Sequence, residues 1–181
     1  MFEIFVYVVL ALAIVVAALL AYAATKPDTF RVQRSTGINA PAERIFPLIA
    51  NLKSMNTWNP FVDPDPAIKI AYSGPDSGKG AAHTWRGNSK VGEGRIEITD
   101  AVPSSRVAMQ LNMLKPVKAH NAVEFTLQPT GSETTVTWAM SGRQPFLAKL
   151  MTVFIDCDKM VGGQFERGLG KLKTISEQRS G

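Results

Sequence analysis

The feature that most constrains this chain is a long stretch in which apolar and polar residues alternate with a period of two. Between residues 68 and 140, six segments show this alternation, and the last of them places Val136, Trp138 and Met140 on one face. Such alternation is typical of a strand with one buried face. The turns between the later segments, such as "VPSS" and "QPTGSE", are short and rich in turn-forming residues. The pattern predicts an antiparallel meander whose apolar face needs a partner.

The last segment, from Pro145 to about Glu177, supplies that partner. Its apolar residues recur with helical spacing and fall on one stripe, which consists of Leu147, Leu150, Met151, Phe154, Val161, Phe165, Leu169 and Leu172. A stripe of this kind has to be buried against another apolar surface. A further strand within residues 30–38 and two short helices within "NAPAERIFPLIANLKSMNTW" precede the meander. The sequence therefore predicts an α+β fold in which a long C-terminal helix packs on an antiparallel sheet.

Residues 4–23 form a run of twenty residues without a charge. As a helix, such a run spans roughly 30 Å, which matches the hydrocarbon core of a bilayer. A cleaved signal peptide is the competing interpretation, because the small residues within 21–23 suit a cleavage site. The segment before the run has no Lys or Arg, however, and the run is longer than a typical signal core. We predict an uncleaved transmembrane anchor over residues 1–25, a linker over 26–29 and a folded domain over 30–178.

Charges beside the apolar run predict its orientation. Lys26, Arg31 and Arg34 follow the run, whereas Glu3 precedes it. By the positive-inside rule, the C-terminal domain is expected to face the cytoplasm. The lipid bilayer, contacted through residues 4–23, is therefore one predicted partner of a single-pass membrane protein.

Composition excludes several other partners and chemistries. The net charge of +5 is scattered along the chain without an arginine-rich run, so we predict no nucleic-acid partner. The single cysteine, Cys157, excludes an intramolecular disulfide and fits a reducing compartment. The two histidines, His83 and His120, belong to no spaced pair of metal ligands. We therefore predict no metal site and no cofactor.

Glycines and aspartates interrupt the predicted long helix within "DCDKMVGGQFERGLG". Asp158 lies inside the apolar stripe, so its carboxylate is paired, protonated or exposed. One interpretation is a helix break within residues 156–158, with an aspartate as N-cap. The other places Asp158 in a cavity, where it binds a polar group of a ligand. Gly162 and Gly168 flank the stripe, where missing side chains leave room for a ligand or a closely packed strand.

The order of these elements resembles the START-like helix-grip superfamily, also called SRPBCC or the polyketide cyclase/dehydrase and lipid-transport superfamily. The resemblance runs from Phe30 to the end of the chain. It is clearest in two segments, "RSTGINAPAERIFPLIANLKSMNTWNP" and "FERGLGKLK". It implies a curved sheet wrapped around the long helix and a cavity that, in many members, holds lipids, sterols, polyketides or other apolar molecules. Functions in this superfamily differ widely, so the fold alone does not fix the chemistry.

Aromatic residues and methionines of the sheet and the final helix are candidates to line such a cavity. The predicted ligand-binding residues are Trp58, His83, Trp85, Met109, Leu111, Phe125, Trp138, Met140, Met151, Phe154, Asp158, Gly162 and Phe165. Core packing is the alternative explanation for each apolar member. His83 shares a strand face with Trp85 and is either a hydrogen-bonded histidine at the rim or a general acid or base.

We therefore expect a membrane-anchored domain that binds a hydrophobic small molecule, such as a lipid or lipid-like metabolite, and the sequence favours binding over catalysis. One alternative is an enzyme of the polyketide cyclase or dehydratase type, with His83 or Asp158 as its catalytic candidates. Another is an interaction module for a membrane partner, in which the cavity is collapsed. The sequence names neither the ligand nor a protein partner.

Overall fold

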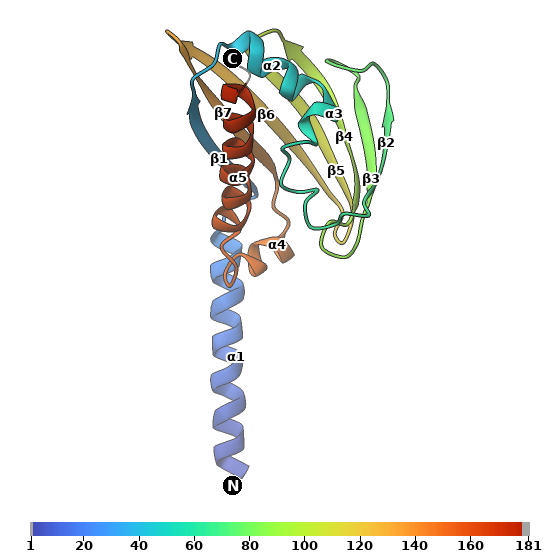
Figure 1. Cartoon of the computed structure of the whole chain (residues 1–181). Coiled ribbons are helices and arrows are strands. Elements are labelled where there is room, and N and C mark those ends of the chain that lie inside the picture. Colours follow the sequence, from blue (N-terminus) through green and yellow to red (C-terminus); the bar gives the residue numbers. More distant parts are fainter. Residues whose placement is uncertain (1, 179–181) are drawn as a thin grey trace.

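The first element of the chain is a single long apolar helix that projects from a compact domain (Figure 1). The structure is a computed structural model that describes residues 2–178. Helix α1 (Phe2–Thr25) contains an 18-residue window with a mean hydropathy of 3.1, none of which is buried in the domain. Its length and composition are those of a membrane span or a signal sequence. The predicted anchor over residues 1–25 coincides with α1, except that residue 1 lies outside the described residues.

The domain is built on one antiparallel sheet of seven strands. In spatial order the strands are β1-β7-β6-β5-β4-β3-β2, so the first strand along the chain pairs with the last. Their bounds are β1 (Thr29–Ile38), β2 (Lys69–Ser73), β3 (Ala82–Arg86), β4 (Glu93–Val102), β5 (Arg106–Lys115), β6 (Ala119–Thr130) and β7 (Glu133–Arg143). The predicted α+β class and the meander are confirmed, because every strand after β2 pairs with the strand before it.

Strand register defines the end of the domain that joins α1, which we call the base. Thr29, the first residue of β1, pairs with Arg143 at the end of β7. On the other side of the sheet, Met113 pairs with Ala119, so the β5–β6 turn lies at the same end. The β3–β4 turn, residues 87–92, also lies at the base, as Figure 1 shows.

Two short helices follow β1, as the sequence predicts. Helix α2 (Ala42–Ala50) begins after Pro41, and helix α3 (Leu52–Met55) begins after Asn51. The Asn51 side chain accepts hydrogen bonds from the backbone N–H groups of Lys53 (2.9 Å) and Ser54 (3.0 Å), which is a typical N-cap.

The C-terminal segment forms two helices rather than one. Helix α4 (Phe146–Met151) is separated by a turn from helix α5 (Cys157–Gln178). The side chain of Asp156 accepts a hydrogen bond from the Lys159 N–H at 2.9 Å, so the predicted break with an aspartate cap is confirmed. The break also divides the predicted stripe. Its later members Phe165, Leu169 and Leu172 are buried, whereas Leu147, Met151 and Phe154 are exposed.

Helix α5 covers only part of the sheet. It packs mainly on β1, with fewer contacts to β7 and α2, and Figure 1 shows the remaining strands curving past it. Far from the base, the space inside this curve is filled by a packed core that includes Trp58, Phe125, Ile98 and Leu172. Close to the base, side chains do not completely fill the space between the sheet and α5.

Candidate functional site

An apolar cavity of about 270 Å³ lies between the sheet and α5 in the base half of the domain. The registers place it there, because its walls include Met113 beside the β5–β6 turn and Val91 in the β3–β4 turn. Most of the side chains around it are apolar. The lining residues are Met55, Asn59, Phe61, Val62, Ile68, His83, Trp85, Lys90, Val91, Ile96, Leu111, Met113, Asn121, Val123, Trp138, Met140, Val161 and Phe165.

The loop over residues 59–68, which precedes β2, covers the cavity between α3 and the edge of the sheet. Two acidic side chains hold this loop in place. The Asp63 carboxylate pairs with Lys171 of α5 at 2.6 Å. The buried Asp65 carboxylate accepts a hydrogen bond from the Asn88 N–H at 2.6 Å, which ties the loop to the β3–β4 turn. This cover loop is thus held by α5 on one side and by the β3–β4 turn on the other, and its apolar residues Phe61 and Val62 line the cavity.

One wall of the cavity is aromatic. The rings of Trp138 on β7 and Phe165 on α5 are stacked, with centroids 4.2 Å apart and planes 10° apart. Phe61 of the cover loop meets both rings edge-on. Gly168 makes this arrangement possible, since a Cβ atom there would lie 2.7 Å from the Trp138 ring and 2.9 Å from Pro60. Gly168 is therefore a close-packing glycine behind the aromatic wall.

Two buried polar atoms in the cavity wall have no hydrogen-bond partner among the described residues: the indole nitrogen of Trp138 and Nδ1 of His83. Trp138 is 3% exposed, and its N–H is a donor only. Leaving such a group unpaired costs about 1–3 kcal/mol. By contrast, the indole N–H of the buried Trp58 donates to the Leu48 carbonyl at 2.9 Å. Trp138 and His83 both line the cavity, and these two atoms lie covered within its wall.

His83 lies on β3 between two aromatic rings. Its centroid is 5.6 Å from that of Tyr72 and 5.8 Å from that of Trp85, and its side chain is buried. Burial lowers the pKa of His83 to about 4, and the adjacent Thr84 backbone opposes this shift only in part. The imidazole is therefore neutral at neutral pH, with one nitrogen as donor and the other as acceptor. This state suits hydrogen bonding better than proton donation.

The structure brings together six of the predicted ligand-binding residues. They line the cavity and are His83, Trp85, Leu111, Trp138, Met140 and Phe165. Three others, Trp58, Met109 and Phe125, lie in the packed core beyond the cavity and are at most 2% exposed. Their aromatic and thioether groups fill the interior, so core packing explains these three.

Met151 and Phe154 were predicted to line the cavity, but they lie outside it. They are 53% and 72% exposed, at the end of α4 and in the turn after it. The prediction assumed a single continuous helix, in which both residues share a stripe with Phe165. Because the helix breaks before Cys157, the stripe does not continue through the turn, and the two side chains point away from the sheet.

Asp158 and Gly162 also lie outside the cavity. The Asp158 carboxylate pairs with the Arg34 guanidinium at 2.8 Å, and the same guanidinium pairs with Glu166 at 2.8 Å. The hydrogen bond and charge of Arg34 lower the pKa of Asp158. A Cβ atom on Gly162 would collide with the Arg34 guanidinium, so this glycine makes room for arginine and not for a ligand. Since Asp158 and His83 are apart, they cannot act together on one substrate.

Sequence reasoning missed several lining residues. The cover-loop residues Phe61 and Val62 fall in "NPFVDPDP", which the sequence identifies only as a turn-rich loop. Asn121 had a usable signal, because it shares its strand face with Val123 and Phe125 although it is polar, and it is 8% exposed. Met113 likewise follows Leu111 on the apolar face of β5.

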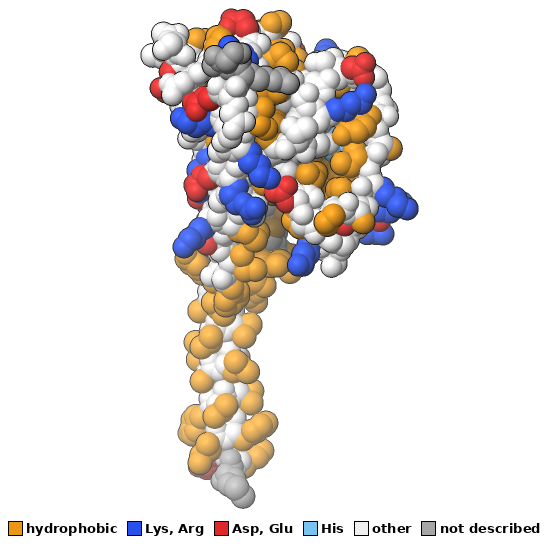
Figure 2. Space-filling model, viewed as in Figure 1, with side chains coloured by type: hydrophobic (Ala, Val, Ile, Leu, Met, Phe, Trp, Pro, Cys, Tyr) orange, Lys and Arg blue, Asp and Glu red, His pale blue; other side chains and the backbone are white. Residues whose placement is uncertain are grey.

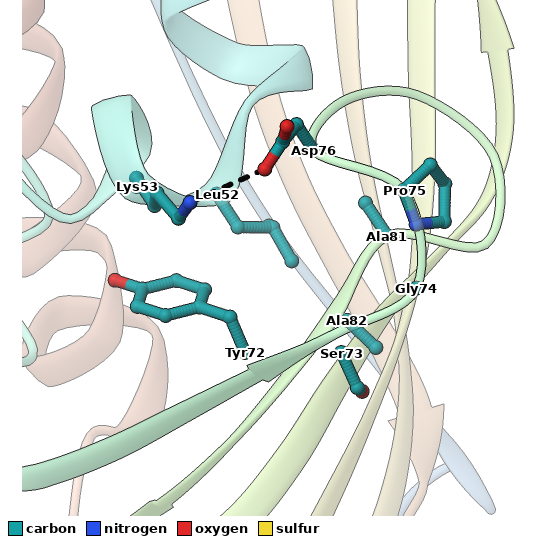
Figure 3. Close-up of a pocket in the computed structure, with 9 residues that line it drawn as sticks. All are labelled: Leu52, Lys53, Tyr72, Ser73, Gly74, Pro75, Asp76, Ala81 and Ala82. Carbon is teal, nitrogen blue, oxygen red and sulfur yellow. Dashed lines mark hydrogen bonds and ion pairs between the residues drawn. The ribbon is translucent and has the colours of Figure 1, made fainter.

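A second hollow, of about 180 Å³, lies at the other end of β2 and is drawn in Figure 3. Lys53 and Asp76 face each other across it at 3.2 Å, and both side chains are largely exposed. Its polar atoms are open to solvent and already paired, so it does not combine burial with unused hydrogen-bonding groups. Among the described residues, no group of three or more His, Cys, Asp or Glu side chains is placed to hold a metal ion.

Comparison with known proteins agrees with this architecture. In solved structures, protein MLL2253 from Mesorhizobium loti has a TM-score of 0.61 at 15% identity, covering 84% of this chain and 99% of that chain. The Aha1 dimer from Colwellia psychrerythraea has a TM-score of 0.59 at 19% identity, with 84% and 99% coverage. TTHA0849 from Thermus thermophilus has a TM-score of 0.58 at 16% identity, with 84% and 100% coverage. At these identities the likeness concerns the fold.

Sequence comparison goes further. A search of curated proteins found no match. The family model described as "Polyketide cyclase / dehydrase and lipid transport" matches residues 29–177, which is the whole domain from the first strand to the end of α5. The chain belongs to the polyketide cyclase/dehydrase and lipid transport family.

Proposed function

We propose that this domain binds a hydrophobic small molecule in the base cavity and that α1 holds the domain at a membrane. The observation that carries the proposal is the cavity itself, which is apolar, bounded by sheet, helix and cover loop, and about 270 Å³ in volume. Ligand sites in proteins are commonly clefts of this kind, with a few placed polar groups. An open cavity favours ligand binding over an interaction module with a collapsed interior.

The apolar walls supply most of the affinity in this proposal. Burying apolar ligand surface stabilises a complex by about 25 cal/mol per Å² removed from water. Thioethers at the cavity, from Met55, Met113 and Met140, adapt to ligands of different shape because the methionine side chain is flexible. The walls therefore suit a compact alkyl or ring system.

The unpaired polar atoms define the polar part of the ligand. The Trp138 N–H requires an acceptor, and the neutral His83 ring offers a donor or an acceptor. A carbonyl or hydroxyl oxygen satisfies both requirements without bringing a charge into the apolar cavity, where an unpaired charge is costly. We infer that the ligand is uncharged where it meets these two residues, as in a ketone, an ester or an alcohol of lipid type.

The family name also admits a cyclase or dehydratase, but the cavity favours binding. His83 and Lys90 are the titratable residues of its lining, and Lys90 is exposed in the β3–β4 turn. With a pKa of about 4, His83 lacks the imidazolium proton that a general acid donates at neutral pH, and its neutral ring is a weak general base.

The membrane assignment rests on α1 and the charges that follow it. The helix is long and apolar enough to cross a bilayer. Lys26 and Arg31 lie just beyond its C-terminal end, so we propose that the domain faces the cytoplasm. Hydrophobic ligands concentrate in membranes, and an anchored cavity remains close to that supply.

The test compares the small molecules that co-purify with full-length protein variants in lipid nanodiscs. Leu111→Trp places a large ring in the cavity, whereas Ala122→Trp adds the same ring to the exposed face of neighbouring β6. Mass spectrometry of the extracts is expected to find a hydrophobic molecule enriched over empty nanodiscs in the wild type and in Ala122→Trp, and reduced in Leu111→Trp. Equal recovery from all three, with circular dichroism showing folded protein, contradicts ligand binding in this cavity.

A further inference from the structure

An exposed apolar surface surrounds the point where α1 meets the domain. Helix α4, the turn after it and the first turns of α5 contribute large apolar side chains that are 42–72% exposed. We call this surface the collar, and its residues are Phe146, Leu147, Met151, Phe154, Ile155 and Met160. Figure 2 shows hydrophobic side chains continuing from α1 onto the base of the domain. Surfaces of this kind on soluble domains usually mark a contact with another apolar body.

Hydrogen bonds and an ion pair fix the collar to the end of α1. Lys149 of α4 is buried and pairs with Asp28 of the linker at 2.6 Å, and this pairing lowers the pKa of Asp28. The ammonium group of Lys26 donates to the Thr152 carbonyl at 2.9 Å, and the Gln144 N–H donates to the Asp28 carbonyl at 2.7 Å. Helix α4 also packs against α1. The collar therefore cannot move away from the level at which α1 leaves the domain.

A second apolar tip lies at the same end of the domain. At the end of β5, Leu114 is 53% exposed, and in the β5–β6 turn Val117 is 71% exposed. Cationic residues stand beside this tip, with Lys118 next to Val117 and Lys90 in the adjacent β3–β4 turn, whereas both Asp156 and Lys159 stand beside the collar. Apolar side chains flanked by lysines are typical of segments that rest in the interface of an anionic bilayer.

We propose that the collar and the β5–β6 turn insert into the bilayer interface, so that the domain docks on the membrane base-down. A bilayer is the favoured occupant because the collar continues the surface of α1, and a membrane that receives α1 meets the collar next. The flanking lysines match anionic headgroups. Docking itself does not require a ligand. Its consequence, that the cavity exchanges ligand directly with the membrane surface, rests on the proposed function.

The single cysteine makes this docking measurable with one fluorophore per molecule. In a Cys157→Ser background, an environment-sensitive fluorophore is attached to full-length Phe154→Cys or Leu147→Cys and the protein is reconstituted in phosphatidylcholine/phosphatidylglycerol vesicles. Val9→Cys in α1 is the reference for membrane insertion, and Ser132→Cys in the β6–β7 turn, at the end opposite the base, is the reference for water. Lipids that carry a quencher at a shallow depth report contact with the interface.

The proposal expects blue-shifted emission and strong quenching by the labelled lipid at Phe154 and Leu147, with neither effect at Ser132. Emission at Phe154 and Leu147 that matches Ser132 overturns the proposal. Emission shielded from water but insensitive to the lipid quencher also overturns it, because a second copy of the chain or another protein then covers the collar. Failure of membrane anchoring gives a separate result, the absence of quenching at Val9, and loss of ligand binding changes none of these signals.

Discussion

The two halves of the domain interior are built from the same strands and yet are filled differently. Away from the base, Trp58 and Phe125 meet edge to face with centroids 5.9 Å apart, and both are fully buried. Near the base, the corresponding space on the same sheet holds a cavity whose walls leave polar atoms on His83 and Trp138 unpaired. The distal half is filled and the base half is not, although Ser176 Oγ in the distal half also lacks a hydrogen-bond partner among the described residues.

The difference follows from which elements cover the sheet. In the distal half, α2, α3 and the later turns of α5 all contribute to one core, with Ile45, Leu52 and Leu172 among its buried members. Helix α5 packs mainly on β1, with fewer contacts to β7, and in the base half a loop covers the strands beyond them. A loop supplies fewer large side chains than a helix face, and the space left over becomes the cavity. The lesson is that a curved sheet holds a ligand where helical cover ends.

The largest expected effect comes from truncating a large side chain in each half. Trp58→Ala removes a fully buried indole and its hydrogen bond, and should lower the free energy of unfolding by about 3–5 kcal/mol. Met113→Ala, which opens into an existing cavity, should cost less than about 1 kcal/mol. Denaturant unfolding of the detergent-solubilised chain measures both values. Equal losses would mean that the two halves are packed alike.

The next effect is a dependence of the free energy of unfolding on pH, and it arises from His83 in the wall of the cavity. The folded state keeps His83 neutral down to about pH 4, whereas the unfolded chain protonates it below about pH 6.5. The unfolded state then binds more protons, so stability falls as the pH is lowered from about 6.5 to 4, by up to about 3 kcal/mol. His83→Gln should remove this loss and the exposed His120→Gln should keep it. A loss unchanged in His83→Gln refutes the assignment.

Two glycines of α5 should respond to alanine to very different extents. Gly168→Ala pushes a Cβ atom against the Trp138 ring and Pro60, so it should destabilise the domain by about 1–3 kcal/mol and weaken ligand binding. Gly162→Ala meets only the end of the flexible Arg34 side chain. Its gain in helix propensity, about 1 kcal/mol, offsets the weakened surface ion pairs, so stability should change little. Thermal unfolding and retention of ligand compare the pair. Reduced ligand retention in Gly162→Ala would contradict this prediction, because it would mean that Gly162 contributes to the cavity wall.

The smallest effect concerns a single hydrogen bond. Trp138→Phe keeps an aromatic ring stacked on Phe165 but removes the unpaired N–H. Affinity for a carbonyl ligand such as methyl nonyl ketone should fall several-fold, which corresponds to about 1 kcal/mol. Affinity for undecane, which has no oxygen, should stay the same. Calorimetric titration of both compounds makes the comparison, and an equal loss for both would assign Trp138 a purely steric role.

Much of the fold could be predicted from the sequence because its signals are local. The alternation along β4 to β7 and the helical segments within residues 39–58 depend on neighbouring residues only, and the structure confirms the meander and the two short helices. The break at Asp156 was visible in the same way. The positions of Met151 and Phe154 could not be predicted in this way. A helical wheel assumes one continuous helix, whereas the turn between α4 and α5 changes the direction in which the side chains before it point.

The cavity was harder to predict because it depends on contacts between distant parts of the chain. Arg34 on β1 lies 124 positions before Asp158, and nothing near either residue indicates that they pair. Likewise, the cover loop reaches the site only because Asp63 and Asp65 bind α5 and the β3–β4 turn. Strand parity identified His83, Trp85 and Leu111, whereas the loop residues required the tertiary structure.

The most direct test of the account uses its three tryptophans as reporters of the two halves. Fluorotryptophan labelling of the full chain in nanodiscs gives one fluorine NMR signal for each of Trp58, Trp85 and Trp138. Titration with methyl nonyl ketone should shift the Trp85 and Trp138 signals in a saturable manner and shift the Trp58 signal much less, because Trp58 lies outside the cavity and only contacts the Trp138 ring edge-on, at 5.7 Å between centroids. If the ketone shifts no signal, or shifts all three equally, the base cavity is not the binding site.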